Sequence, residues 1–278
     1  MKINDIIKYF EQAEEGSTAT TRRSALKDFG VKVAMASLPF AAGSLYTKKA
    51  NAQSKETLIN ILNYLLKLEL IVAEFYTQAY GTANLIPAAF STQFQSVVDQ
   101  NKSHVATLQR LVTELGGTPY TIIDTDIDIT GGRGSGNGEF VNSLSNFTTF
   151  IVQAQYFTDG AVRLYKGQIF EVLTDNITVR ALMNIHSTKA RQATFIRFTR
   201  KYMDGTKINP WITGTNTDTT NTAVQRMYAG ESITEQLGIY VPGLNGFDNI
   251  TIDVSTEAFD EPINKVDGEN IINRFIKG

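Results

Sequence analysis

The first long patterned segment of the chain, from about residue 56 to residue 80, has apolar side chains at every third or fourth position. Its common face holds Leu58, Leu62, Leu65, Glu69, Val72 and Tyr76. Steps of three and four residues place side chains on one face of an α-helix. Gly81 follows directly and favours a helix end there. The segment therefore predicts an amphipathic helix with one acidic residue, Glu69, on its apolar face.

Three further segments have the same period, and each predicts an amphipathic helix. The second runs from near Pro87 to Gly116, the third from about residue 139 to 173, and the fourth from about residue 175 to 203. The face of the second helix holds Val97, Asn101, His104, Leu108, Leu111 and Leu115. The face of the third holds Phe147, Ile151, Ala154, Thr158, Ala161 and Tyr165. The face of the fourth holds Leu182, Ile185, Lys189, Gln192, Ile196 and Met203.

The connections between these segments predict the fold. Short connections join the first helix to the second and the third to the fourth, so each pair forms an antiparallel hairpin. Residues 117–138 separate the two hairpins and include six glycines. A connection of this length can cross from one end of a bundle to the other. The pattern predicts an all-α protein, an antiparallel four-helix bundle over residues 53–204 with a long crossover between its second and third helices.

The helical period disappears after Gly205. Residues 205–278 combine turn-forming residues with scattered apolar ones, which is typical of a mostly irregular extension. Alternation in residues 250–254 predicts a short strand. Five apolar residues predict that the extension packs on the bundle: Trp211, Phe247, Phe259, Ile271 and Phe275.

The N-terminal 52 residues are predicted to be a targeting segment rather than part of the fold. Residues 21–27 read Thr-Arg-Arg-Ser-Ala-Leu-Lys, which resembles the twin-arginine export motif with Ala25 in place of its usual Phe. An apolar stretch over residues 33–45 and a small-residue site over residues 50–52 follow, in the order of a signal peptide. The stretch is too short to span a bilayer. We expect an exported, periplasmic protein with no membrane span in its mature form.

Composition excludes several classes of function. The chain has no cysteine and only two histidines, His104 and His186, so thiolate metal sites and cysteine nucleophiles are ruled out. Eight of the 26 basic and five of the 28 acidic residues precede residue 53, so the rest carries a net charge of −5. A mildly acidic chain without a basic stripe is not expected to bind nucleic acid.

Each helical face carries polar residues where a core favours leucine. Glu69, Asn101, His104, Thr158, Lys189 and Gln192 occupy these positions. Buried charges are costly unless they are paired or bound to a metal. If the faces meet at matching heights, these residues form one polar layer inside the bundle.

In these segments the sequence resembles the ferritin-like domain proteins, in particular the branch related to plant desiccation-associated proteins. The resemblance covers most of residues 55–278. It rests on Leu68-Glu69, Ala73-Glu74-Phe75-Tyr76, Lys102-Ser103-His104-Val105-Ala106, Ala161-Val162-Arg163-Leu164-Tyr165-Lys166-Gly167 and Ala258-Phe259-Asp260-Glu261-Pro262, in this order. It implies a stress-related role and, in members that hold metal, a di-metal site.

A ferritin-like di-metal site needs one Glu from each of two helices and Glu-x-x-His from each of the other two. Glu69 and His104 match this set and are the candidate metal ligands. Asn101, Thr158, Lys189 and Gln192 stand where the other ligands are expected. Without the carboxylates the charge that holds divalent cations is lost, and Lys189 adds a repelling cation. We therefore predict that Lys189 pairs with Glu69, with the remaining hydrogen bonds made by Asn101, Thr158, Gln192 and His104.

Two functions remain open at the level of sequence. The first is a non-catalytic structural, stress-related or interaction protein with a degenerate metal site, no catalytic residue and no cofactor. The alternative is an iron- or manganese-dependent oxidoreductase that uses Glu69 and His104 in an atypical site. It would need further ligands outside the predicted register, such as Glu74, Asp99 or Asp159. A homo-oligomer, or a hetero-oligomer with a related ferritin-like chain, is compatible with either function.

Two smaller features also carry chemical groups. Asp124, Asp126 and Asp128 alternate in the crossover, which is compatible with calcium binding, but Asn137 replaces the closing Glu of a calcium loop, so an exposed acidic loop is favoured. Tyr76 and Tyr165 are predicted to be core tyrosines whose hydroxyls are hydrogen-bonded.

Overall fold

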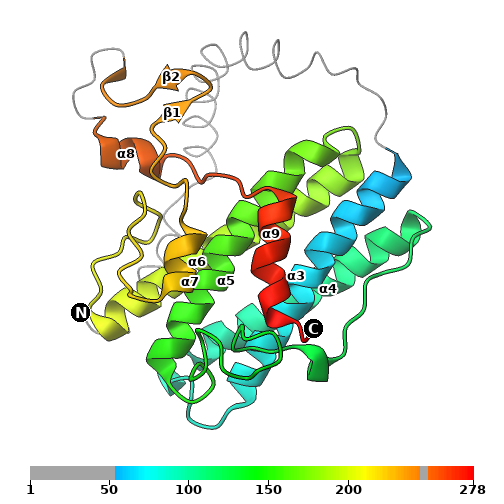
Figure 1. Cartoon of the computed structure of the whole chain (residues 1–278), viewed down its shortest axis with the longest axis horizontal. Helices are drawn as coiled ribbons and strands as arrows, with labels where there is room; N and C mark the ends of the chain where they lie inside the picture. Colours follow the sequence, from blue (N-terminus) through cyan, green and yellow to red (C-terminus); the bar gives the residue numbers. More distant parts are fainter. Residues whose placement is uncertain (1–53, 245–249) are drawn as a thin grey trace, which may run out of the picture. The chain divides into compact units, whose positions relative to one another are not determined.

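The computed structural model describes residues 54–244 and 250–278, so the predicted signal segment, residues 1–52, lies outside the described residues. Four long helices form the centre of the fold (Figure 1): α3 (Lys55–Gly81), α4 (Ser91–Glu114), α5 (Phe147–Ile169) and α6 (Asn176–Asp204). The predicted all-α fold is confirmed. In the described part of the chain, no helix is long and apolar enough to cross a membrane.

The four helices form two antiparallel hairpins, as the short connections predicted. Tyr80 near the end of α3 hydrogen-bonds Ser91 at the start of α4. At the other end of this hairpin, the side-chain amide of Asn63 on α3 donates to the backbone carbonyl of Thr118, which follows α4. In the second hairpin, Thr148 at the start of α5 bonds Asp204 at the end of α6. α3 also packs against α5, and α4 against α6, which closes the bundle.

Side-chain caps explain where the helices begin. The hydroxyl of Ser54 accepts from the Thr57 amide before α3, and the carboxylate of Asp175 accepts from the Thr178 amide before α6. The expected start of the third helix near residue 139 is wrong, because Asn146 caps α5 by accepting from the Thr149 amide. Residues 139–146 form turns instead.

The crossover is fastened to the C-terminal end of the chain. It contains a short 3-10 helix, Asp124–Asp126. Ile127 forms an antiparallel bridge with Ile276. On either side of this bridge the Asp128 amide donates to the Phe275 carbonyl and the Lys277 amide to the Asp126 carbonyl. Backbone hydrogen bonds therefore fix residues 126–128 of the crossover to residues 275–277 at the end of the chain.

The extension contains short elements: α7 (Thr222–Met227), β1 (Glu235–Gln236), β2 (Ile239–Tyr240), α8 (Ile252–Glu257) and α9 (Lys265–Ile272). β1 and β2 pair antiparallel. α7 and α9 pack on α5, and α9 also contacts α3 (Figure 1). The strand expected at residues 250–254 is wrong, because the Thr251 hydroxyl caps α8 by accepting from the Val254 amide.

Apolar residues anchor the extension unevenly. Phe275 is 1% exposed and lies against Phe140, Tyr156 and Phe157. Trp211 is 51% exposed, so its side chain is not a core residue as that of Phe275 is. Phe259 is 37% exposed, and Phe247 lies outside the described residues.

Candidate functional site

An ion pair lies at the centre of the bundle. Glu69 of α3 and Lys189 of α6 are both completely buried. The Lys189 ammonium donates to Glu69 Oε2 at 2.8 Å and to Asn101 Oδ1 of α4 at 2.5 Å. The pairing expected from the register of the helical faces is therefore present.

Two further residues complete the surroundings of the Glu69 carboxylate. The Tyr165 hydroxyl of α5 donates to Oε1 at 2.9 Å, and Nδ1 of His104 on α4 lies 3.3 Å from Oε2. The Asn101 amide group donates to the Val97 carbonyl of its own helix at 2.7 Å. One carboxylate on α3 thus contacts side chains from all three other helices. We call Glu69, Asn101, His104, Tyr165 and Lys189 the polar centre.

The electrostatics of the polar centre favour a charged Glu69. Burial raises the pKa of Glu69, but the Lys189 ammonium and the contact with His104 lower it more, so its pKa lies below the ordinary value. Burial lowers the pKa of Lys189 more than Glu69 raises it. Burial also raises the pKa of Tyr165, and the neighbouring Glu69 carboxylate adds to this, so Tyr165 stays a hydroxyl donor.

The side chains of the polar centre do not fit the ligand set of a di-metal site. Such a site requires carboxylate oxygens that face the cations, whereas both Glu69 oxygens accept hydrogen bonds from protein groups. The Lys189 ammonium lies at the heart of the centre and would repel a divalent cation. In the described ranges, 54–244 and 250–278, no three His, Asp or Glu side chains come close enough together to hold a metal ion.

Besides each other, Glu69 and Lys189 contact three side chains: the sequence predicted Asn101 and His104 and missed Tyr165. The hydrogen bonds expected from Thr158 and Gln192 are wrong: Thr158 donates to the Ala154 carbonyl, and Gln192 donates to Gln100. Tyr165 takes the role expected of Thr158. A helical side chain leans toward the N-terminus of its helix, so a tyrosine reaches the level of the preceding turn. That rule could have identified Tyr165.

The residues considered as ligands outside the predicted register lie apart from the polar centre, each with another partner. Glu74 accepts from Gln78, and Asp99 accepts from Gln95. Asp159 binds Arg197 through both carboxylate oxygens at 3.0 Å. They therefore do not complete a metal site around Glu69 and His104.

Asp159 belongs to a second buried network that the sequence did not predict. Its carboxylate accepts from the Arg197 guanidinium and the Tyr228 hydroxyl, and Arg197 also donates to the Trp211 carbonyl. Nearby, buried Arg163 of α5 pairs with Glu231 at 2.6 Å. These contacts join α5 and α6 to the extension. They explain several buried charges without any ligand.

The polar centre approaches the surface through His104. This residue is 7% exposed and lines a hollow of about 470 Å³ between α4 and α6. Ser103, Asn184 and Thr188 line the same hollow. His104 is thus the member of the centre that solvent can reach.

The acidic crossover is organised by one of its aspartates. Both oxygens of the Asp128 carboxylate accept hydrogen bonds, from the Thr130 hydroxyl and from the amides of Thr130, Gly134 and Gly136. Burial raises the pKa of Asp128, but these hydrogen bonds lower it more. The exposed acidic loop is confirmed for Asp124 and Asp126 and is wrong for Asp128, which is buried.

Comparison with known proteins agrees with this architecture. The sequence profile of the ferritin-like domain family matches residues 57–201, which include nearly all of the four long helices. Searches among curated proteins and among solved structures found no match. The matched segment is more than half of the chain, and the chain therefore belongs to the ferritin-like domain family.

Proposed function

We propose that this chain is an exported ferritin-like protein in which a buried ion pair has replaced the di-metal site, and that its role is structural or in molecular interaction rather than catalytic. The observation that carries this proposal is the contact of the Lys189 ammonium with Glu69. The predicted signal segment at residues 1–52 supports export. The resemblance to desiccation-associated proteins supports a role under stress.

The charge balance supports the replacement. Two divalent cations in such a site are balanced by about four carboxylates. The polar centre has one carboxylate and one ammonium. A buried ion pair is tolerated when hydrogen bonds satisfy its remaining donors and acceptors, and Asn101, His104 and Tyr165 supply them.

Metal content tests the proposal. The protein would be purified without chelators, offered ferrous iron or manganese, and analysed by mass spectrometry after removal of free metal. We expect fewer than about 0.1 metal ions per chain, because bound metal requires deprotonated, unpaired ligands. A near-stoichiometric content in the wild type would contradict the proposal and favour the oxidoreductase that uses Glu69 and His104.

A designed variant supplies the positive control. Asn101→Glu, Lys189→Glu and Gln192→His, made together, place Glu-x-x-His on both α4 and α6. We expect this variant to retain more metal than the wild type. Lys189→Met is the matched variant that removes the cation without adding a carboxylate, and it should retain no more metal than the wild type.

A further inference from the structure

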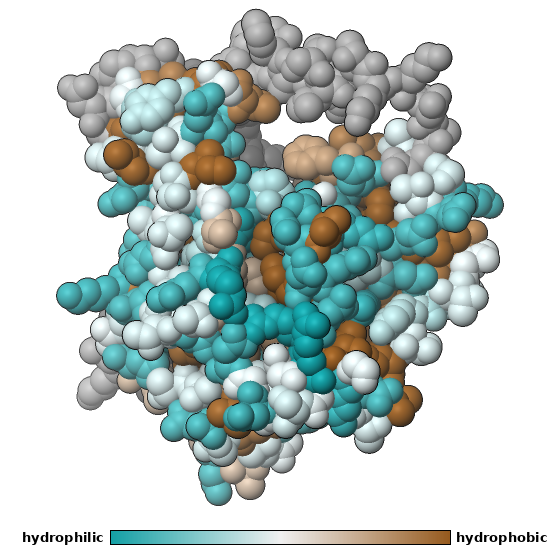
Figure 2. All heavy atoms as spheres, in the orientation of Figure 1, coloured by the Kyte–Doolittle hydropathy of each residue, from teal (hydrophilic) through white to brown (hydrophobic). Residues whose placement is uncertain are grey.

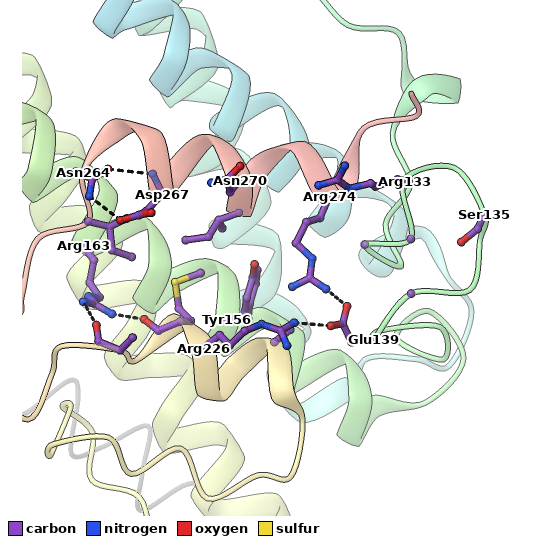
Figure 3. A pocket seen from close by; sticks show the side chains of 18 of the residues that line it. Arg133, Ser135, Glu139, Tyr156, Arg163, Arg226, Asn264, Asp267, Asn270 and Arg274 are labelled. Carbon is purple, nitrogen blue, oxygen red and sulfur yellow. Dashed lines mark hydrogen bonds and ion pairs between the residues drawn. The ribbon is translucent and has the colours of Figure 1, made fainter.

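A large groove lies away from the polar centre, between the crossover and the extension. It has a volume of about 1070 Å³. Crossover residues between 131 and 138, together with Glu139, line one end. α7 and α9 line its sides, and Tyr156 and Arg163 of α5 also line it (Figure 3). Figure 2 shows that hydrophilic residues predominate on this face around α9. The volume is of the size that small organic ligands occupy.

Three arginines gather at the crossover end of this groove. Arg226 and Arg274 both bind the Glu139 carboxylate, Arg226 at 2.6 Å (Figure 3). Burial lowers the pKa of Arg274, and the nearby positive charge of Arg133 lowers it further. Within the described ranges, the exposed Arg133 side chain has no acidic partner. The Glu139 carboxylate cannot neutralise three guanidinium groups, and the Asp128 carboxylate held in the neighbouring turn offsets only part of the remainder, so this end keeps an excess of positive charge.

The other charged groups nearby do not cancel this excess. Arg163 is saturated, since it pairs with Glu231 and donates to the carbonyls of Met227 and Ala229. The backbone amides of Gly134 and Gly136 are used by Asp128 and are not free to hold an anion. The guanidinium groups are therefore the anion-binding donors at this end.

Uncharged hydrogen-bonding groups occupy the middle of the groove, and an asparagine–aspartate pair lies at its far end. Tyr156 is 1% exposed, and in Figure 3 its hydroxyl points into the groove. Among the residues that the structure describes, none hydrogen-bonds this hydroxyl. Asn270 lies further along α9, and Asn264 donates to the Asp267 carboxylate at the far end at 2.6 Å. Asp267 would repel a second anionic group and can accept hydrogen bonds from hydroxyls.

We propose that this groove binds a polyhydroxylated organic anion, such as a sugar acid or a sugar phosphate. Its carboxylate or phosphate lies among Arg133, Arg226 and Arg274, where charge-assisted hydrogen bonds are available. Its hydroxyls meet Tyr156, Asn270 and Asp267. The groove shares no residue with the polar centre, so this proposal does not depend on the proposed function.

Calorimetric titration of the full chain at low salt tests this site. The probes are glucuronate and glucose 6-phosphate, with glucose and inorganic phosphate as comparators. We expect at least one anionic sugar to bind about tenfold more tightly than either comparator, because it satisfies both ends of the groove. The tighter of the two anionic sugars identifies the head group as carboxylate or phosphate.

Two single variants locate the binding. Arg133→Gln and Arg226→Gln should each weaken binding about tenfold, the effect of losing one charge-assisted hydrogen bond. Both side chains are largely exposed, so the fold should persist, and an unchanged unfolding temperature verifies this. Arg191→Gln on the exposed face of α6 removes the same charge elsewhere and should leave affinity unchanged.

Three results would overturn the proposal. The first is the absence of binding of both anionic sugars at millimolar concentration. The second is inorganic phosphate binding as tightly as glucose 6-phosphate. The third is an affinity that neither Arg133→Gln nor Arg226→Gln alters.

Discussion

At the scale of single residues, the polar centre separates two tyrosines that the sequence treats alike. Tyr76 and Tyr165 are both completely or almost completely buried. The Tyr165 hydroxyl donates to the Glu69 carboxylate at 2.9 Å. The Tyr76 hydroxyl is buried and has no hydrogen-bond partner among the described residues, so the expectation that it is hydrogen-bonded is wrong. The same substitution should therefore have different effects at the two positions.

Tyr165→Phe should lower the free energy of unfolding by about 1.5–3 kcal/mol, because it removes a hydrogen bond to a buried charged group. Tyr76→Phe is the matched control and should be neutral or stabilising, since it removes a buried hydroxyl without a partner. Chemical denaturation of both variants measures these changes. Equal losses at the two positions would argue against a charged Glu69 at the centre.

Glu231 provides a second residue-scale test through pH. Burial raises the pKa of Glu231 to about 7, more than its pairing with Arg163 lowers it. The folded chain therefore binds more protons than the unfolded chain between about pH 4.5 and 7. The stability that this group contributes is present in acid and is lost as pH rises through 7.

In the wild type, the unfolding temperature should therefore decline between pH 5 and pH 8. Glu231→Gln should make this decline smaller, because a glutamine has no proton to release. Thermal scans in a pH series measure this. Glu235→Gln is a control from the same extension that removes an exposed carboxylate. A wild-type profile in which stability rises with pH, and which Glu231→Gln leaves unchanged, would contradict the raised pKa.

At the scale of elements, the extension approaches the bundle closely where glycines allow it. A Cβ on Gly167 of α5 would lie 2.1 Å from the Ile263 carbonyl oxygen. The Ile263 amide donates to the Arg163 carbonyl one turn earlier on the same helix. Backbone thus packs directly on backbone before α9 begins. Since the obstacle is a backbone atom, a side-chain rotation cannot relieve the clash.

Gly167→Ala should lower the free energy of unfolding by about 1–3 kcal/mol, the usual effect of overpacking. Gly81→Ala, at the end of α3, is the matched control, because a Cβ added there would meet no atom of the described residues within 4 Å. Denaturant titration compares the two variants. An unchanged stability of Gly167→Ala would show that this segment of the extension does not pack against α5.

At the scale of the whole molecule, the helical periods predict the bundle well and the extension poorly. The four periods suffice because each long helix buries a continuous apolar face. They also predict that Glu69 and Lys189 meet, because both lie in register on facing helices. The extension is held by contacts between distant residues, such as Asp159 with Arg197 and Tyr228, which no local period reveals.

The groove was equally hidden from the sequence. Arg133, Arg226 and Arg274 are separated by more than forty residues at each step along the chain. They meet only because the crossover bridges to the end of the chain at Ile127 and Ile276 and α7 packs on α5. Sequence patterns report faces of single helices, and they do not report where loops from different parts of the chain converge.

The polar centre joins all four helices of the bundle, so its ion pair affects the stability of the molecule as a whole. The central claim is that Glu69 and Lys189 stabilise each other. Lys189→Met alone leaves a buried carboxylate without its cation and should cost about 3–5 kcal/mol. Glu69→Gln alone leaves a buried ammonium without its carboxylate and should also destabilise the fold.

The most direct measurement is a double-mutant cycle of Glu69→Gln and Lys189→Met in metal-free buffer, read as the free energy of unfolding. The account predicts that the double variant is more stable than the sum of the single losses implies, with a coupling of at least about 2 kcal/mol. Additive losses, with a coupling below about 0.5 kcal/mol, would contradict the account.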